Sequence, residues 1–458
     1  MRIGLLGHGV VGQGVRKIID AHQTSATAAM SVVRILVRDQ SEITDERITT
    51  DPEEFFTTDM DVVVECMGGV DKPFEFVSRA LSAGMGVVSS NKKLLAHKYD
   101  ELQALATQRQ VPLAFEAAIG GGIPWLHNLA LTAQVDEVES FRGIFNGTTN
   151  YILDEMFTHG QNFDDALRGA QERGYAEADP SDDIDGHDVK YKTVLTANRI
   201  WGVSVPLEQV PALGLRHVDG RDAKWAAAHG KTIKLLGMAR ATNQGVMAGA
   251  MPVMLPANHL LAGIHQNFNC AMVNSNNFGE AAYYGQGAGM LPTAFAVVSD
   301  LVSVQALMVQ DSFALAAPGR TVVAPMWQEA WGQNASPLSR EVASVDQLVS
   351  SPAQSLEVAP MDQSALQGKY YLRPENSEDF DLLWDLVEFT RPEKLENGAI
   401  LTGGVHLPLL MNSLRRAGFT TGVVGDISTL VCEVEDSSAK MVADRGLFLA
   451  LVDSGLNE

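Results

Sequence analysis

The sequence is poor in cysteine and has fewer basic than acidic residues. Its three cysteines, Cys66, Cys270 and Cys432, lie far apart and form no CxxC pair. This spacing excludes a disulfide framework and a thiolate zinc site, and it is typical of a protein in the reducing cytoplasm. Lys and Arg number 34 against 56 Asp and Glu, which gives a formal net charge of −22. We therefore expect no binding to nucleic acid or to an anionic membrane, since both draw on clustered cations.

Long apolar segments are also missing. Residues 1–7 have one positive charge, an apolar run interrupted by glycine and no small-residue cleavage site, so they do not resemble a targeting signal. Residues 245–264 carry no charge but contain Pro252, Pro256 and His259, which argues against a bilayer-spanning helix. The remaining composition is ordinary for a globular protein, with 46% hydrophobic and 20% charged residues. We expect a cytoplasmic protein whose length allows about three domains.

Short apolar runs alternate with amphipathic stretches over the first 130 residues. We expect buried strands at residues 3–6, 32–37, 62–65, 86–89 and 111–115, and helices at residues 10–21, 73–83 and 98–108. Strands alternating with helices of this length predict right-handed βαβ units and a parallel sheet. Further along, the sequence predicts a strand at residues 138–145 and helices at residues 151–173, 188–201 and 291–310. Residues 333–366 are rich in Ser, Ala, Gln and Pro, as in a linker, and residues 369–458 could form a small third domain.

A glycine-rich segment follows the first expected strand. Its sequence, Gly7-His8-Gly9-Val10-Val11-Gly12, has the spacing GxGxxG and leads into the first expected helix. In this motif the first glycine permits a tight turn, the second lets a pyrophosphate approach the backbone, and the third allows close helix packing. The helix N-terminus then offers N–H groups to the phosphates. The context of strand and helix favours dinucleotide binding over a turn that serves packing alone.

The end of the second expected strand bears on the choice between NADP and NAD. An Arg at this position accommodates the 2′-phosphate of NADP, whereas an Asp or Glu holds the ribose 2′-hydroxyl of NAD. Arg38 stands there and favours NADP, while the adjacent Asp39 is compatible with NAD. The alternative is an exposed Arg–Asp turn with no cofactor role.

Residues 174–192, GYAEADPSDDIDGHDVKYK, hold five Asp and one Glu. An EF-hand loop aligned on Gly186 would end at Lys192, where calcium needs a bidentate Glu, so that interpretation fails. Two interpretations stay open, a solvated acidic loop and a polar site that leads into a helix. In the second, Asp188 and Lys192 share one helix face at the spacing i, i+4. An acidic wall suits a substrate ammonium group, and a Lys held beside an Asp can donate a proton.

At this point the sequence resembles homoserine dehydrogenase. The matching stretches lie within the first 320 residues in the family's order: residues 7–12, SNKK at 90–93, EAAIGGGIP at 116–124, NGTTNYIL at 146–153, residues 174–192, and YGQGAGMLPTA at 284–294. The resemblance implies reversible NAD(P)-dependent reduction of L-aspartate 4-semialdehyde to L-homoserine, a step in threonine, methionine and isoleucine biosynthesis. Two rival interpretations are another Rossmann oxidoreductase that acts on an amino-acid carbonyl, and a catalytically silent amino-acid sensor.

The resemblance also implies roles for individual residues. Lys192 corresponds to the proton donor to the carbonyl oxygen, and Asp188 orients its ammonium group. Lys92 corresponds to a second lysine close to the substrate and the nicotinamide, although a surface lysine after a strand would look the same. Glu177 and Asp188 correspond to substrate contacts, with Asp183 beside them.

Two further sites follow from the resemblance. Gly289 corresponds to a glycine that returns to the cofactor. Glu116, with the carbonyl groups of Ile119, Gly121 and Ile123, corresponds to a structural site for a monovalent cation such as sodium. The alternative for Glu116 is that its carboxylate merely caps the turn into the glycine run.

The implied architecture has three parts. Residues 1–130 and 291–320 form a dinucleotide-binding domain with a Rossmann-type parallel sheet, and residues 131–290 form a mixed α/β domain that binds substrate and makes a homodimer. After a linker at residues 321–366, residues 367–458 form a small, divergent ACT-like α+β domain. Its first expected strand, residues 369–373, lacks the Pro-Gly ligand loop of ACT domains, and a helix at 406–417 and a strand at 430–435 follow. We therefore expect that the polar linker can be cut without opening a core, so that a chain ending near Ser336 keeps dehydrogenase activity and responds to threonine no more than the full chain does.

Overall fold

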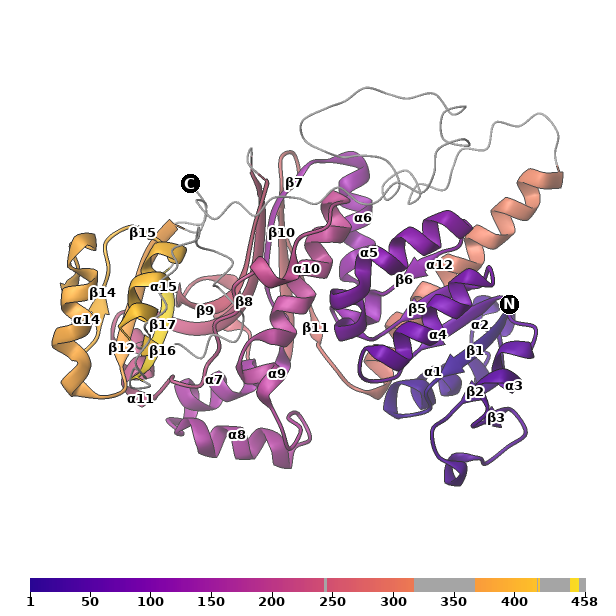
Figure 1. The fold of residues 1–458 in the computed structure, drawn as a ribbon, viewed down its shortest axis with the longest axis horizontal. Coiled ribbons are helices and arrows are strands. Elements are labelled where there is room, and N and C mark those ends of the chain that lie inside the picture. Colours follow the sequence, from indigo (N-terminus) through magenta and orange to yellow (C-terminus); the bar gives the residue numbers. More distant parts are fainter. Residues whose placement is uncertain (243–244, 317–366, 418, 421–444, 453–458) are drawn as a thin grey trace, which may run out of the picture.

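Two β-sheets organise the chain. The computed structural model describes residues 1–242, 245–316, 367–417, 419–420 and 445–452 (Figure 1). Within these residues the chain forms a six-stranded sheet and an eleven-stranded sheet. The expected linker at residues 321–366 and the expected strand at residues 430–435 lie outside the described residues.

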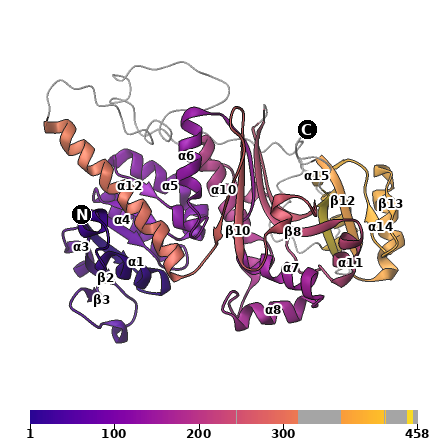
Figure 2. The ribbon, with the colours of Figure 1, turned by 180° about the vertical axis from the view of Figure 1, so that it is seen from behind.

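The first sheet is entirely parallel and has the strand order β3-β2-β1-β4-β5-β6. Side chains alternate between its faces, so Ile3 and Leu5 pack toward α1 and α12, whereas Leu6 packs with α3, α4 and α5. Figure 2 shows α12 running along α1 on one side of this sheet. The strands are β1 (Arg2–Leu6), β2 (Ser31–Leu36), β3 (Ile48–Thr49), β4 (Val62–Glu65), β5 (Gly86–Ser89) and β6 (Leu113–Ala114). The helices are α1 (Val10–Asp20), α2 (Ser25–Ala28), α3 (Pro52–Thr57), α4 (Asp71–Ser82), α5 (Lys92–Arg109) and α12 (Met290–Ala316).

The second sheet is mixed and has the order β11-β10-β7-β8-β9-β17-β12-β14-β13. In addition, β15 pairs with β12, and β16 pairs with β17. Its strands are β7 (Val138–Ile144), β8 (Lys231–Thr242), β9 (Gly245–Pro256), β10 (Phe268–Ser275), β11 (Gly279–Gln286), β12 (Gln367–Pro374), β13 (Glu393–Lys394), β14 (Ile400–Leu401), β15 (Val405–His406), β16 (Phe419–Thr420) and β17 (Arg445–Val452). The accompanying helices are α6 (Trp125–Val135), α7 (Gly147–His159), α8 (Phe163–Glu172), α9 (Ser181–Ile184), α10 (His187–Trp201), α11 (Gly220–Ala228), α14 (Phe380–Val387) and α15 (Leu407–Arg416).

The C-terminal strands continue this second sheet. Strand β17 pairs in parallel with β9, and β12 pairs with β17. Leu372 and Leu410 of the C-terminal part share one buried cluster with Leu236 and Met251 of β8 and β9. The expectation that the chain can be cut in the linker without opening a core is therefore wrong, because removal of residues 367–458 would uncover these apolar side chains.

One other expectation differs from the structure. The helix expected at residues 151–173 is divided into α7 and α8, because Gly160 adopts a left-handed conformation (φ 67°) and Asn162 caps α8. The uncharged residues 245–264 form β9 and a short 3-10 turn. Among the described residues one helix, α12, is long and apolar enough to cross a membrane, but Val297 and Leu301 of this helix are fully buried in the core of the first sheet.

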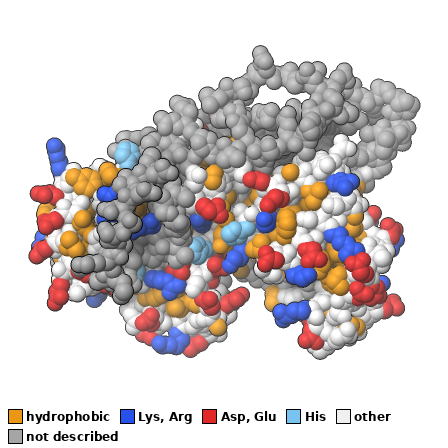
Figure 3. Space-filling model, in the orientation of Figure 1, with side chains coloured by type: hydrophobic (Ala, Val, Ile, Leu, Met, Phe, Trp, Pro, Cys, Tyr) orange, Lys and Arg blue, Asp and Glu red, His pale blue; other side chains and the backbone are white. Residues whose placement is uncertain are grey.

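Acidic and basic side chains are interspersed over the face of the described residues seen in Figure 3. On this face the acidic side chains are thus spread among basic and apolar ones and do not form a single charged field.

Candidate active site

The glycine-rich loop lies at the carboxyl end of β1, where the order of the parallel sheet reverses between β1 and β4. Gly7 has φ 98°, which favours glycine, and a Cβ atom on Gly12 would lie 2.3 Å from the carbonyl oxygen of Gly7. Helix α1 begins after Gly9 with no side-chain cap, so its first N–H groups point out of the helix without a side-chain acceptor. A dinucleotide pyrophosphate fits this loop, because the backbone can approach it and the helix end favours negative charge.

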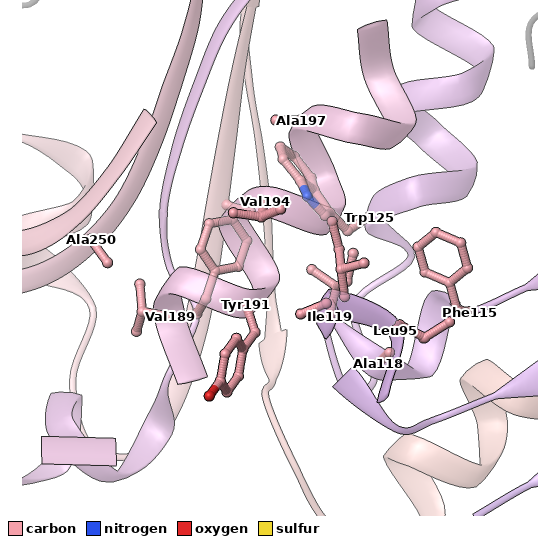
Figure 4. Close-up of a cluster of buried hydrophobic side chains, with 14 of the residues drawn as sticks. Leu95, Phe115, Ala118, Ile119, Trp125, Val189, Tyr191, Val194, Ala197 and Ala250 are labelled. Atoms are coloured by element: carbon pink, nitrogen blue, oxygen red, sulfur yellow. The ribbon is translucent and has the colours of Figure 1, made fainter. Parts of the chain in front are cut away.

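Helix α10 carries the charged residues of the site and is itself held by apolar packing. Figure 4 shows its side chains Val189, Tyr191 and Val194 in a buried cluster with Leu95 of α5 and Trp125 of α6. This cluster therefore joins the helix of the second domain to elements of the dinucleotide-binding domain. Because both sides are packed, the polar face of α10 has a fixed position relative to the carboxyl end of the parallel sheet.

One carboxylate on this helix contacts two lysines. Asp188 is 1% exposed, and its Oδ2 accepts a hydrogen bond of 2.8 Å from Lys192 Nζ. Lys92 Nζ, from the first turn of α5, forms an ion pair of 2.6 Å with Oδ1. Lys192 also donates to the carbonyl oxygen of Phe145 at 2.6 Å. The structure thus brings together the three residues that the resemblance implied as catalytic, one of them from the other domain.

These contacts change the acidity of the three groups. Burial works to raise the pKa of Asp188, but the nearby Lys192 and Lys92 ammonium groups outweigh it and hold this pKa well below its usual range. Burial lowers the pKa of Lys192, and the attraction of Asp188 only partly opposes this effect. In contrast, the charge of Asp188 raises the pKa of Lys92. Lys192 is consequently the stronger acid of the two lysines.

Asn146 was not among the predicted site residues, although it begins the NGTTNYIL motif. Its Oδ1 caps α7 by accepting from the Thr149 N–H, and its Nδ2 donates to Asp188 Oδ2 at 2.9 Å and to Asp183 Oδ1 at 2.7 Å. Burial, together with the charge of Asp188, raises the pKa of Asp183. An Asn before Gly-Thr-Thr is a recognisable helix-cap signal, but the second use of its amide group depends on contacts far apart in the sequence.

Lys92 is positioned by a buried carboxylate at the end of β4. Glu65 is fully buried and accepts hydrogen bonds from Ser89 Oγ at 2.5 Å and from the Met67 N–H at 2.8 Å. The Asn91 side chain donates to Glu65 Oε1 at 3.3 Å and caps α5, the helix that starts with Lys92. Burial raises the pKa of Glu65 to about 7. This group of hydrogen-bonded residues could not be predicted from the sequence, because none of them is unusual alone.

Other predicted residues are less closely connected. Within the described residues, the exposed Glu177 carboxylate makes no hydrogen bond or ion pair with the lysines, although the Glu177 carbonyl accepts from Gln171. Arg38 is exposed just beyond β2, and Asp39 caps the 3-10 turn that follows. Gly289 has φ 121° and precedes α12, whose first turn packs against α1.

The Glu116 carboxylate caps the N-terminus of α6. Its two oxygens accept backbone hydrogen bonds of 2.7 to 2.8 Å from Trp125, Leu126 and His127. Burial raises the pKa of this carboxyl group to about 7. The carboxylate is therefore a cap, as in the alternative, but it caps α6 after the glycine run and not the turn into it. The described residues contain no cluster of His, Cys, Asp and Glu suited to a metal ion.

A glycine-rich loop that fits a dinucleotide, with two lysines and a buried carboxylate at the same carboxyl edge of the parallel sheet, is the arrangement expected of a nicotinamide-dependent oxidoreductase. The sequence model named homoserine dehydrogenase matches residues 124–302, and the model named homoserine dehydrogenase, NAD binding domain, matches residues 7–116. The chain belongs to the homoserine dehydrogenase family.

Individual relatives agree with this assignment. The homoserine dehydrogenase of Bacillus subtilis is 35% identical over 342 residues, which are 72% of this chain and 77% of the relative. That of Neisseria gonorrhoeae is 33% identical over 416 residues, 88% of each chain. The crystal structure of a homoserine dehydrogenase from Thiobacillus denitrificans matches with a TM-score of 0.75 at 29% identity, covering 91% of this chain and 94% of that chain.

Proposed function

We propose that this chain catalyses the reversible reduction of L-aspartate 4-semialdehyde to L-homoserine. The observation that carries the proposal is the contact of the buried Asp188 with Lys192 and Lys92. Lys92 follows β5 at the carboxyl edge of the parallel sheet, the edge where the glycine-rich loop that fits a dinucleotide follows β1. Membership of the family supports the substrate. A silent amino-acid sensor would have no need to keep a lysine of lowered pKa buried beside a carboxylate.

Lys192 acts as the proton donor in the reduction. A bound nicotinamide supplies the hydride to the carbonyl carbon. As negative charge develops on the carbonyl oxygen, the Lys192 ammonium group donates its proton to that oxygen, and in the oxidation of homoserine the neutral amine takes the hydroxyl proton. The lowered pKa of Lys192 suits both directions, because an acid or base is most effective when its pKa lies near the working pH.

Asp188 holds the Lys192 ammonium group in place, and Lys92 balances the charge of the Asp188 carboxylate. Asp188 fixes the Lys192 Nζ through a hydrogen bond of 2.8 Å, and Lys92 neutralises the remaining carboxylate oxygen. Lys92 is partly exposed, with 40% of its side chain accessible, so it can also reach a substrate carboxylate. We assign the substrate ammonium group to the acidic side of the site, where Asp183 and the exposed Glu177 stand.

We propose NADP as the preferred cofactor and NAD as a weaker one. The exposed Arg38 beyond β2 supports this preference, because a guanidinium group there is available to a 2′-phosphate. Asp39, which would hold the ribose of NAD, is engaged instead as the cap of the following turn.

A monovalent cation such as sodium is a second proposed ligand. Glu116 and the carbonyl groups of Ile119, Gly121 and Ile123 would hold it next to the N-terminus of α6. The support is the buried Glu116 carboxylate, whose ion-pair partner among the described residues is His127, with Nδ1 at 3.5 Å from Oε2. Raising sodium chloride in place of choline chloride should raise the melting temperature of the unaltered chain more than that of a Glu116→Gln variant.

We also propose a cytoplasmic homodimer. Strand β11 lies at one edge of the second sheet. Tyr284 on this strand is 59% exposed, and Phe278 just before it is 63% exposed. Apolar side chains along a sheet edge are suited to a second copy of the chain. The free thiols of Cys66 and Cys270 fit a reducing compartment. Light scattering should give twice the 49.3 kDa mass of one chain, and a Phe278→Asp variant should shift toward the monomer.

Initial rates of homoserine oxidation test the proposed function. We expect L-homoserine to reduce NADP faster than NAD and L-serine, which is one methylene shorter, to reduce neither at a comparable rate. Absence of homoserine-dependent reduction with both cofactors would reject the function.

A further inference from the structure

Residues 179–188, which include α9 and lead into α10, are named the acidic loop here. A segment that sequence analysis left unassigned lies between this loop and the C-terminal strands. Residues 211–218 run from the end of the short 3-10 turn Leu207–Gln209 to α11. At one end the segment pairs with β9, where Leu213 N–H donates to the carbonyl oxygen of Ala250 at 2.8 Å. We name residues 211–218 the bridging segment.

The bridging segment is packed directly on the acidic loop. The Leu215 N–H donates to the carbonyl oxygen of Ile184 at 2.7 Å, and a Cβ atom on Gly214 would lie 2.3 Å from the same oxygen. Only glycine allows this approach. The loop and the segment therefore cannot shift independently by more than a small distance.

A charged pair fixes the same contact. Asp185 is 3% exposed and stands between Asp183 and Asp188 in the sequence. Both of its oxygens accept from the Arg216 guanidinium group, with Nη2 at 2.7 Å from Oδ2. Such a two-point contact defines orientation as well as distance. Because 42% of the Arg216 side chain is exposed, we expect the pair to contribute mainly geometry and little stability.

The other side of the bridging segment is held by the C-terminal strand β12. Arg373 is 1% exposed and donates to the carbonyl oxygen of His217 at 2.6 Å. The same guanidinium group contacts both oxygens of the fully buried Asp222 at 2.6 and 2.8 Å, and Tyr371 OH donates to Asp222 Oδ1 at 2.7 Å. Asp222 in turn accepts from the Asp219 N–H at the start of α11.

We propose that Arg216 and Arg373 are positioning residues that act in series, so that β12 holds the acidic substrate loop in its working geometry through the bridging segment. The C-terminal part of this chain is then a component of the active-site scaffold. This inference rests on the proposed function, because the loop that it positions carries Asp183 and leads into Asp188.

The first test uses variants of the exposed pair, which are expected to fold. Arg216→Met should lower kcat/KM for L-homoserine by about tenfold to a hundredfold, since small misplacements of a site can cost that much. The loss should come from a higher KM for homoserine, whereas the KM for the cofactor should stay unchanged. Arg216→Lys, which restores the charge but not the two-point contact, should recover part of the loss. Arg168→Met is the matched control, because Arg168 is exposed and pairs with Asp165 on α8, outside the acidic loop and the bridging segment.

The second test asks whether the two arginines act in series. Arg373→Met leaves Asp222 buried without its cation, so the pair should also be replaced together, as Arg373→Met with Asp222→Leu, and checked for folding by circular dichroism. The Arg373→Met variant and the Arg373→Met/Asp222→Leu variant should each lower kcat/KM for homoserine. Adding Arg216→Met to either of them should cause no further loss, because the Arg216–Asp185 contact no longer positions the acidic loop once Arg373 is lost.

The outcomes separate this inference from the proposed function. Failure of the unaltered chain to oxidise homoserine would reject the proposed function. If the unaltered chain is active, any of three results would overturn the inference. These are wild-type kinetics for Arg216→Met, equal changes in the KM values of homoserine and cofactor, and losses in kcat/KM that multiply when the Arg216 and Arg373 substitutions are combined.

Discussion

Replacing Lys192 by Met removes the proposed acid and keeps most of its volume. The loss of a positioned acid typically lowers kcat by about 10²–10⁴-fold, or about 2.7–5.4 kcal/mol in the activation free energy. The effect on folding should be smaller than the usual loss of about 3–5 kcal/mol for a broken buried ion pair. Asp188 keeps Lys92 at 2.6 Å and the Asn146 amide at 2.9 Å, so its charge is still compensated.

The assay is the initial rate of homoserine-dependent reduction of the cofactor, with a thermal melt of each variant. Lys190→Met is the matched control, because Lys190 is also buried on α10, at 5% exposure, but does not contact Asp188. We expect a normal melt and a collapsed kcat for Lys192→Met, with kcat retained in the control. A Lys192→Met rate within about threefold of the unaltered chain would refute the role of Lys192 as the acid.

Four further predictions follow from the same contacts. Homoserine oxidation should rise with pH through the pKa of Lys192, which burial places below the ordinary lysine value, because the neutral amine is the base; a pH–rate profile without this inflection would contradict the assignment. Arg38→Ala should weaken NADP binding by about 1.5–3 kcal/mol and leave NAD binding unchanged, and equal rises in both KM values would return Arg38 to a surface role. Asn146→Leu should lower both the melting temperature and kcat/KM, whereas Asn162→Leu, which uncaps α8, should lower only the melting temperature; retained kcat/KM in the first variant would refute the second role of its amide. A chain ending at Ser336 should have a lower melting temperature and tend to aggregate, as light scattering would detect, and a soluble, active product would contradict the shared core.

The parallel sheet could be predicted from the sequence because its strands are buried on both faces. Each of β1, β2, β4 and β5 is an almost continuous apolar run, and the predicted bounds agree within one residue. Strand β3 has two residues and leaves no such pattern. The pairing of β17 with β9 joins positions about two hundred residues apart, and no local pattern encodes it.

The site could be predicted in part. The i, i+4 spacing of Asp188 and Lys192 indicated their contact, since it follows from helix geometry. Lys92 reached the prediction only through the family resemblance, because its approach to Asp188 depends on how two domains pack. Arg216 gave no signal at all, since an exposed arginine in a loop is ordinary until its buried partner is known.

The most direct test of the central claim follows the fate of the hydrogen on the alcohol carbon. L-Homoserine that carries deuterium on the carbon bearing the hydroxyl group should be oxidised with the unaltered chain and NADP, and the cofactor should then be examined by mass spectrometry. Hydride transfer within this site predicts reduced cofactor that carries deuterium, together with aspartate 4-semialdehyde as the product. Unreduced cofactor, or reduced cofactor without deuterium, would contradict the claim.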